Sequence, residues 1–135
     1  MIAGIGLDLV DIARVQRLIG AKGERALRRL FTAGEAEYAA GKPRPFLHLA
    51  ARVAAKEAAF KALSLADGAR GIGWKEMEVV AGDDGRPSLA LHGRAAACAA
   101  KLGVTRVHLT LSHSETTAGA VVILERSAAA GGGRN

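Results

Sequence analysis

One alanine-rich stretch, residues 49–63 (LAARVAAKEAAFKAL), constrains the fold of this chain more than any other part of the sequence. It combines alanine with other strong helix formers and contains neither glycine nor proline, so it predicts a long helix, which we place at residues 46–65. A helix this apolar is mostly buried. At ~1.5 Å per residue it spans roughly 30 Å, the width of a small domain, so the rest of the chain must pack around it.

The few charged residues of this helix require an explanation, because an unpaired charge inside a fold is costly. Arg52 and Lys56 lie one turn apart on one side of the helix, and Glu57 and Lys61 lie one turn apart on an adjoining side. One interpretation is an ordinary Glu57–Lys61 ion pair, worth about 0.2–0.5 kcal/mol. The other is a metal and phosphate site, in which Glu57 binds a cation and the lysines bind phosphate oxygens. The helix taken alone favours the ion pair.

Shorter patterned segments on both sides of the long helix predict the remaining elements. Apolar or alternating runs predict strands at residues 1–10, 77–80, 88–91, 107–111 and 118–125, with the last two antiparallel to each other. Helices are predicted at residues 12–19, with Asp11 as N-cap and Gly20 at the end, at 32–40, where Thr32 and Glu35 form a capping box, and at 92–102. We therefore expect an α+β fold, with an antiparallel sheet packed on one long central helix and shorter helices around it.

The domain organisation follows from length and composition. The 135 residues are enough for one domain, which we place at residues 1–126. Residues 127–135 (SAAAGGGRN) have nothing to bury and are expected to form a disordered tail. The N-terminus does not resemble a signal peptide, and no apolar run approaches the roughly 20 residues of a membrane span. We therefore expect a cytoplasmic protein with no membrane partner.

The charge balance restricts the class of partner. The chain carries 19 lysines and arginines against 13 acidic residues, a formal charge of +6, which suggests an anionic partner such as nucleic acid, a phosphorylated small molecule or an acidic protein. The cations are densest between residues 14 and 29, where Glu24 is the single acid. This excess favours a docking surface for a polyanion or an acidic protein over a merely solvated helix face. Its cations are Arg14, Arg17, Lys22, Arg25, Arg28 and Arg29.

Asp8 interrupts the apolar strand predicted at the N-terminus. A carboxylate inside a buried strand is either hydrogen-bonded to the protein or a ligand for a bound group. Asp8 lies near the end of that strand, where sites often form. Gly4 and Gly6 in the same strand allow another backbone to approach closely.

Two further segments contain candidate phosphate contacts. Lys42, Arg44 and His48 place cations at the start of the long helix, where the helix dipole already favours anions. The glycine-rich loop at residues 67–73 (DGARGIG) is better explained as a connector, although its backbone could bind phosphate.

The run Ser112, His113, Ser114 ends a predicted strand. Neighbouring side chains alternate across a strand, so these residues do not form a catalytic triad. A phosphate or ribose contact is favoured over a serine nucleophile, and a hydrogen-bonded structural histidine is an equally good alternative.

Three of these stretches occur together and in a characteristic order. They are GIGLDLVDIARV at residues 4–15, ARVAAKEAAFKAL at residues 51–63 and LTLSHSETTAGAVVILE at residues 109–125. In a chain of this length they resemble the holo-acyl-carrier-protein synthase family of 4′-phosphopantetheinyl transferases. GIGWKEMEV at residues 71–79 and DGRPSLAL at residues 84–91 are similar to the middle region of that family. The resemblance covers nearly all of the chain before the expected tail.

The resemblance implies an enzyme that moves the 4′-phosphopantetheine arm of coenzyme A onto a serine of apo acyl carrier protein, in support of fatty acid or polyketide biosynthesis, and releases adenosine 3′,5′-bisphosphate. It implies that Asp8 and Glu57 hold Mg²⁺ on the pyrophosphate and that Lys61 contacts the transferred or leaving phosphate, which makes Asp8, Glu57 and Lys61 the catalytic set. Whether Glu57 or a water on the metal accepts the serine proton stays open. The expected contacts with coenzyme A are Arg44, Arg52, Lys56, Gly71, Gly73, Ser112, His113 and Ser114.

The resemblance also implies partners and assembly. The carrier protein is expected to dock on Arg14, Arg17, Arg25 and Arg28, and the enzyme is expected to be a homotrimer with coenzyme A bound between adjacent subunits. Two other functions are alternatives. A basic nucleic-acid-binding module has few aromatic residues for base stacking here and leaves Asp8 and Glu57 unexplained, so no nucleic acid is expected as a partner. A Mg²⁺-dependent phosphohydrolase would release its product without a carrier protein.

Overall fold

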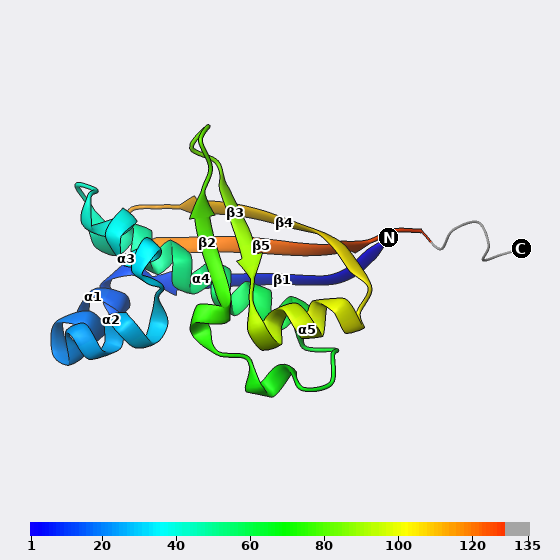
Figure 1. Ribbon diagram of the computed structural model, residues 1–135. Coiled ribbons are helices and arrows are strands. Elements are labelled where there is room, and N and C mark those ends of the chain that lie inside the picture. Colours follow the sequence, from blue (N-terminus) through cyan, green and yellow to red (C-terminus); the bar gives the residue numbers. More distant parts are fainter. Residues whose placement is uncertain (129–135) are drawn as a thin grey trace, which may run out of the picture.

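A three-stranded antiparallel sheet packed against one long helix forms the body of the protein (Figure 1). The computed structural model describes residues 1–128. The strand order is β1 (Ile2–Asp11), β5 (Thr117–Arg126), β4 (Val104–His113), and the helix is α4 (Pro45–Leu63). The hairpin β2 (Met77–Ala81) and β3 (Pro87–Leu91) forms a second, two-stranded sheet. The other helices are α1 (Ile12–Lys22), α2 (Glu24–Leu30), α3 (Ala33–Ala40) and α5 (Gly93–Lys101), with 3₁₀ turns at Ala69–Gly71 and Trp74–Glu76. The predicted α+β fold is confirmed.

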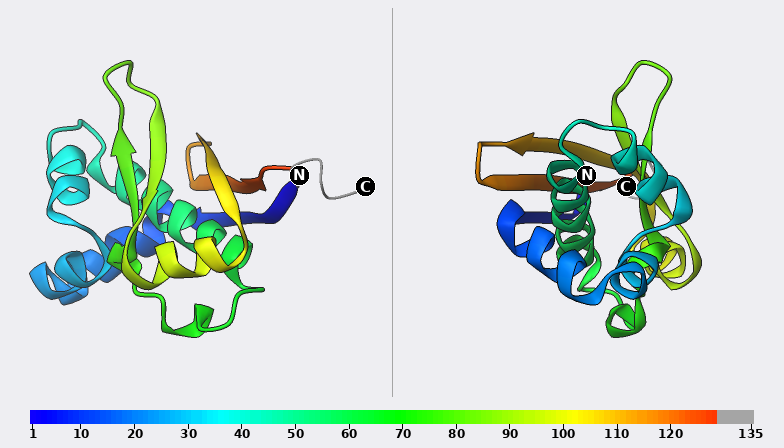
Figure 2. Two further views of the ribbon diagram at one scale, coloured as in Figure 1. Left: turned by 45° about the vertical axis from the view of Figure 1, so that its right-hand side comes forward. Right: turned by 90° about the vertical axis from the view of Figure 1, so that its left-hand side faces the viewer.

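Helix α4 occupies the centre of the molecule, as its sequence predicts. Figure 2 shows it along one face of the sheet, with the β2–β3 hairpin projecting away from the body of the protein. Pro45 begins the helix at a position where its missing N–H costs nothing. Alanines are buried at successive turns, Ala50, Ala54 and Ala58 among them, so neighbouring elements can approach the helix on several sides. Within residues 1–128 no helix is both long and apolar enough to cross a membrane.

Two glycines of β1 bring the strand into direct backbone contact with α4, and the predicted close approach is confirmed. A Cβ atom at Gly6 would overlap the carbonyl group of Ala58, and one at Gly4 would overlap that of Ala62. The strand therefore runs towards the beginning of α4 as it leaves the N-terminus. Asp8, two residues after Gly6 on the same face of the strand, lies beside the middle of the helix.

The opposite face of the sheet is apolar on β1 and β5 and is uncovered in the isolated chain. Ile5, Leu7 and Leu9 of β1 point away from α4, and each is more than half exposed. On β5, Ile123 pairs with Ile5 and Val121 with Leu7, which extends the apolar face across two strands. Asp8 lies between Leu7 and Leu9 in the chain, so the outward face of β1 adjoins the position of the carboxylate.

The structure corrects several predicted boundaries. Helix α1 continues through Gly20 to Lys22, because one glycine inside a helix is tolerated at a cost of about 1 kcal/mol. It ends at Gly23, where φ is 59°. Helix α4 ends at Leu63, two residues earlier than predicted. Asp11 occupies the N-cap position of α1, but its side chain makes no capping hydrogen bond, whereas the capping box of Thr32 and Glu35 is confirmed.

The domain boundary at residue 126 stays a prediction. Ser127 and Ala128 belong to no helix or strand. The rest of the predicted tail, residues 129–135, lies outside the described residues.

Two glycines in different packing environments predict opposite effects of substitution by alanine. Gly6→Ala should lower the free energy of unfolding by about 1–3 kcal/mol, because the new methyl group forces the strand away from Ala58. Gly20→Ala, on an open face of α1, should raise it by about 0.5–1 kcal/mol, because alanine is the better helix former. Urea denaturation measures both values. Equal stability of Gly6→Ala and the wild type would show that β1 does not depend on this contact.

Candidate active site

Asp8 on β1 and Lys61 on α4 form an ion pair. The Lys61 ammonium donates to Oδ1 of Asp8 at 3.0 Å and to the backbone carbonyl of Leu7 at 2.9 Å. The Asp8 side chain is 15% exposed and the Lys61 side chain 53%, so the pair opens to solvent on the lysine side. The Glu57–Lys61 ion pair considered for the isolated helix is absent from the described part of the chain. The reason is that β1 packs so closely on α4 that Asp8 reaches Lys61.

Glu57 lies on α4 one turn before Lys61, on the same flank of the helix. Since Lys61 contacts Asp8, this flank faces the end of β1, and the two carboxylates lie on the same side of α4. Glu57 also lines a pocket of about 280 Å³ whose other walls are mostly apolar: Phe60, Ile72, Trp74 and Met77.

The donor set of Asp8 and Glu57 fits a magnesium ion. Mg²⁺ is usually held by one or two carboxylates, with substrate phosphates and water completing its six oxygen ligands. Among residues 1–128 no group of three or more His, Cys, Asp or Glu side chains forms a complete protein cage for a metal. In the described structure Asp8 pairs with the Lys61 ammonium, so a metal ion would share this carboxylate with that ion pair.

A second group of charged residues surrounds Tyr38, at the other end of α4. The Arg52 guanidinium lies 4.2 Å from the centre of the Tyr38 ring, and the Lys42 ammonium lies 4.7 Å from it. The His48 ring meets the same aromatic ring edge-on at 5.6 Å. Tyr38, His48 and Arg52 border a pocket of about 390 Å³ that reaches Ser112 and His113 at the end of β4. We call Lys42, Arg44, His48, Arg52 and His113 the cationic cluster.

The electrostatics of the cationic cluster favour an anion. Burial and then the positive charges of Arg52, Lys42, His113 and Arg44 lower the pKa of His48. Burial also lowers the pKa of Arg52, whose Nε–H is buried and has no partner in the described structure. Since an unpaired buried donor is costly, a phosphate oxygen at this position would stabilise the cluster.

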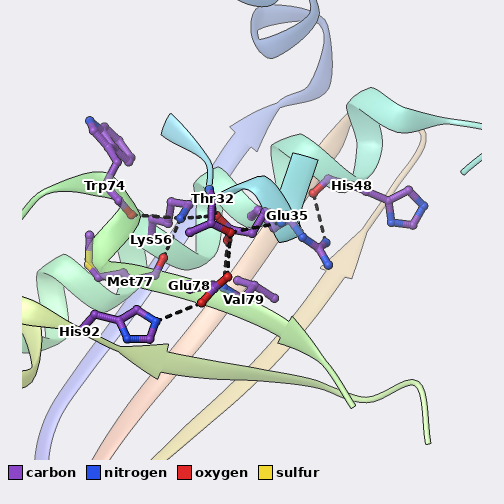
Figure 3. Close-up of polar contacts among 10 residues, drawn as sticks. Thr32, Glu35, His48, Lys56, Trp74, Met77, Glu78, Val79 and His92 are labelled. Carbon is purple, nitrogen blue, oxygen red and sulfur yellow. Dashed lines mark hydrogen bonds and ion pairs between the residues drawn. The ribbon is translucent and has the colours of Figure 1, made fainter. Parts of the chain in front are cut away.

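Lys56 differs from the sequence-based expectation. Its side chain is fully buried, and its ammonium donates to the Glu35 carboxylate at 2.8 Å, the Trp74 carbonyl at 3.0 Å and the Met77 carbonyl at 2.6 Å (Figure 3). Burial lowers the pKa of Lys56, and the Glu35 carboxylate opposes that shift. All three N–H groups are used, so the expected contact of Lys56 with phosphate is corrected to a structural ion pair.

The glycine-rich loop also differs from the phosphate-binding alternative. The backbone N–H of Gly71 donates to the Gly68 carbonyl, and that of Gly73 donates to the Glu76 carboxylate. A Cβ atom at Gly71 would also overlap the Arg94 guanidinium. Both amides serve the loop itself, so the connector interpretation accounts for Gly71 and Gly73, which were expected to contact coenzyme A.

The three residues at the end of β4 separate into two roles. Ser114 accepts hydrogen bonds from the backbone N–H groups of Thr116 and Thr117, so its hydroxyl stabilises the turn into β5. Ser112 and His113 line the pocket of the cationic cluster. Arg44 reaches the same turn and donates to the Glu115 carbonyl at 3.3 Å.

The predicted docking residues lie on α1 and α2. Arg14, Arg17, Arg25 and Arg28 are all exposed, and α1 begins directly after β1. A groove of about 350 Å³ runs between these helices, with cationic side chains around an apolar floor. Its lining residues are Leu18, Lys22, Arg25, Ala26, Arg29, Leu30 and Trp74. We call this depression the α1–α2 groove.

Sequence reasoning missed two contributors to these sites. Glu35 was assigned only to a capping box, yet it also binds Lys56, and a partner 21 positions away leaves no local signal. Tyr38 was also missed, because Lys42 lies beyond the end of α3 and Arg52 lies on α4, so neither contact has a signal within one helix.

Comparison with known proteins gives a consistent result. The model of the 4′-phosphopantetheinyl transferase superfamily matches residues 4–121. The holo-[acyl-carrier-protein] synthase of Anaeromyxobacter sp. (strain K) is 48% identical over 128 residues, which cover 93% of this chain and 97% of that protein. The solved acyl carrier protein synthase of Mycobacterium tuberculosis is 37% identical with a TM-score of 0.70, covering 94% of this chain and 100% of that one. A holo-(acyl-carrier-protein) synthase from Bacillus anthracis, solved in complex with CoA (3′,5′-ADP), is 32% identical with a TM-score of 0.75, covering 94% and 99% of the two chains.

Proposed function

The chain belongs to the 4′-phosphopantetheinyl transferase superfamily, and we propose that it is a holo-[acyl-carrier-protein] synthase, which transfers 4′-phosphopantetheine from coenzyme A to a serine of apo acyl carrier protein. The observation that carries this proposal is the Asp8–Lys61 contact beside Glu57, because it joins two distant motifs into one acidic and cationic site. The similarity to an enzyme solved with CoA (3′,5′-ADP) supports coenzyme A as the substrate.

The proposed reaction is a phosphoryl transfer. The carrier serine oxygen forms a bond to the phosphorus that bears the pantetheine arm, the bond from that phosphorus to the bridging oxygen breaks, and adenosine 3′,5′-bisphosphate leaves. The serine proton passes to a base, for which Glu57 is one candidate. Positioning and charge neutralisation supply most of the rate in reactions of this type.

Three side chains perform this chemistry in the proposal. Asp8 and Glu57 would hold Mg²⁺, which when bound would supply positive charge to the pyrophosphate. Lys61, whose side chain is half exposed, donates an N–H to a phosphate oxygen and so stabilises the developing negative charge.

The cationic cluster is the proposed site for the remaining phosphate of coenzyme A. Arg52 and His113 line the pocket of this cluster, and Arg44 donates to the Glu115 carbonyl at the adjoining turn. The buried Nε–H of Arg52 has no other partner among the described residues. Phosphate groups bind well to guanidinium forks of this kind.

The location expected for the protein, the cytoplasm, stays a prediction.

The two charged sites point in different directions, which supports an assembly with sites between subunits. Arg52 and Glu57 are five positions apart on α4, or roughly 140° around the helix at ~100° per residue. A ligand that contacts both kinds of site is therefore bound more readily between two chains, each of which contributes one site, than by one chain. The apolar outer face of the sheet, formed by Ile5, Leu7 and Leu9 and adjoining Asp8, is the surface we propose for contact in a homotrimer.

The first prediction tests the reaction and its acidic pair. Asp8→Ala and Glu57→Ala should each reduce transfer on the order of 10³-fold, because each removes a ligand of the Mg²⁺ that would neutralise the pyrophosphate. The measurement is the mass of an apo acyl carrier protein after incubation with coenzyme A and Mg²⁺. Asp11→Ala, an exposed acid on the same strand, should keep full activity. Release of the bisphosphate without modification of the carrier would identify a phosphohydrolase instead.

A second prediction tests assembly. Leu7→Arg should give a monomer with little transfer activity, because a charge on the outer face of β1 opposes burial of that face between subunits. Light scattering at micromolar concentration should give three chain masses for the wild type. Val80→Arg, which adds the same charge at an exposed apolar position of β2, should stay trimeric. A fully active wild-type monomer would exclude the interface.

A third prediction tests docking of the carrier. Acyl carrier proteins are acidic, and Arg14 is the first cation of the helix that leaves the site. Arg14→Glu should raise the KM for carrier about tenfold or more and leave the KM for coenzyme A nearly unchanged. Arg28→Glu should act more weakly, and its effect should shrink with added salt, since the Debye length is about 8 Å at physiological ionic strength.

Lys101→Glu, the same charge reversal on α5, serves as the control for the docking variants and should change neither KM. If Arg14→Glu weakened coenzyme A binding and left the carrier KM alone, the basic segment would be a nucleotide-phosphate site rather than a docking surface.

A further inference from the structure

Lys56 is a buried cation that the proposed transfer does not use. It precedes Glu57 in the chain, and its ammonium donates all three N–H groups to acceptors on two other segments (Figure 3). One acceptor is the Glu35 carboxylate of α3. The other two are the backbone carbonyls of Trp74, the first residue of a 3₁₀ turn, and of Met77, the residue that follows the turn.

Glu35 is equally well satisfied, so the ion pair is a specific contact. Its Oε1 accepts from Lys56 and from the backbone N–H of Thr32, and its Oε2 accepts from the backbone N–H of Val79 at 2.8 Å. A buried ion pair needs such additional hydrogen bonds to offset the desolvation of both charges. The contacts extend outwards, because the Thr32 hydroxyl donates to Glu78 at 2.7 Å.

The turn that Lys56 holds separates two surfaces. Trp74 and Met77 form part of the wall of the pocket that contains Glu57. Trp74 also lines the α1–α2 groove, together with Arg25 and Arg29. The Trp74–Met77 segment is therefore a partition, with Glu57 on one side and the cationic docking groove on the other.

We propose that Lys56 is a positioning residue that fixes the Trp74–Met77 partition against α4 and thereby sets the path from the α1–α2 groove to Glu57. The inference rests on the proposed function, because it assigns the groove to the carrier protein and the path to its serine. Lys56 itself touches neither substrate. It acts through the two backbone carbonyls that it holds.

The chemistry of the contact explains why a lysine is required here. A single ammonium offers three N–H donors in different directions, which match one carboxylate and two carbonyls. Methionine fills a similar volume but donates nothing, so the Trp74 and Met77 carbonyls would lose their buried partner. The turn would then relax towards other hydrogen-bond donors, including water.

Trp74 provides a direct measurement that is independent of activity. It is the single tryptophan of the chain, so fluorescence excited at the red edge of tryptophan absorption, where Tyr38 does not absorb, reports on the partition. Lys56→Met should shift the emission of Trp74 and increase its quenching by acrylamide. With coenzyme A saturating, kcat/KM for apo acyl carrier protein should fall about 10- to 100-fold, since small displacements at an active site have effects of this size. The affinity for adenosine 3′,5′-bisphosphate should stay unchanged, because the cationic cluster does not include Lys56.

Thr32→Val is the matched control. It removes the hydroxyl contacts to Glu35 and Glu78 from the same network and leaves the three acceptors of Lys56 in place. It should lower stability without changing Trp74 fluorescence or kcat/KM. If Lys56→Met also lost only stability, with Trp74 and kcat/KM unchanged, Lys56 would be structural and the proposal would be overturned.

A double variant keeps the test decisive if Lys56→Met does not fold. Lys56→Met combined with Glu35→Gln removes both charges, which avoids an unpaired buried carboxylate. It still lacks the donors to Trp74 and Met77, so it should show the same change in Trp74 quenching. Unchanged quenching in a folded double variant would refute the positioning role. Absence of transfer by the wild type would instead refute the proposed function, and the fluorescence result would be unaffected.

Discussion

The rest of the structure depends on the backbone contact between β1 and α4. Gly4 and Gly6 have no side chains, so the strand lies directly on the carbonyl groups of Ala62 and Ala58. A larger residue in the strand or on this face of the helix would separate the two elements and withdraw Asp8 from Lys61. The small residues that appear as mere packing in the sequence therefore set the distance on which the acidic site depends.

The cationic side chains of α4 point in different directions and so lie in different environments. Lys56 points into the protein and is neutralised by Glu35, while Lys61 lies at the surface against Asp8. Arg52 points towards Tyr38, where burial and other cations surround it. Three cations on one helix thus have three different environments, and the environment decides whether each one supports the fold or remains available to a ligand.

The different environments of these side chains also explain which contacts could be predicted from the sequence. Local signals were sufficient for the long helix, the capping box of Thr32 and Glu35, and the close approach at Gly4 and Gly6. Contacts between distant segments left no such signal. The i,i+4 rule offered Glu57 as the partner of Lys61, but Asp8, 53 positions away, is the residue it contacts, because tertiary packing outweighs a helix-surface pair of a few tenths of a kcal/mol. The partners of Lys56 were hidden for the same reason.

The strand order has a consequence for how the protein is made. In the described part of the chain β1 pairs only with β5, the last strand, and Asp8 lies opposite Ala120. The N-terminal strand is thus synthesised before β5 and has no neighbouring strand until residues 117–126 have emerged from the ribosome. Strand β5 therefore completes the acidic site. A nascent polypeptide that already contains Asp8, Glu57 and Lys61 still lacks the strand that pairs with β1 and holds Asp8 in place.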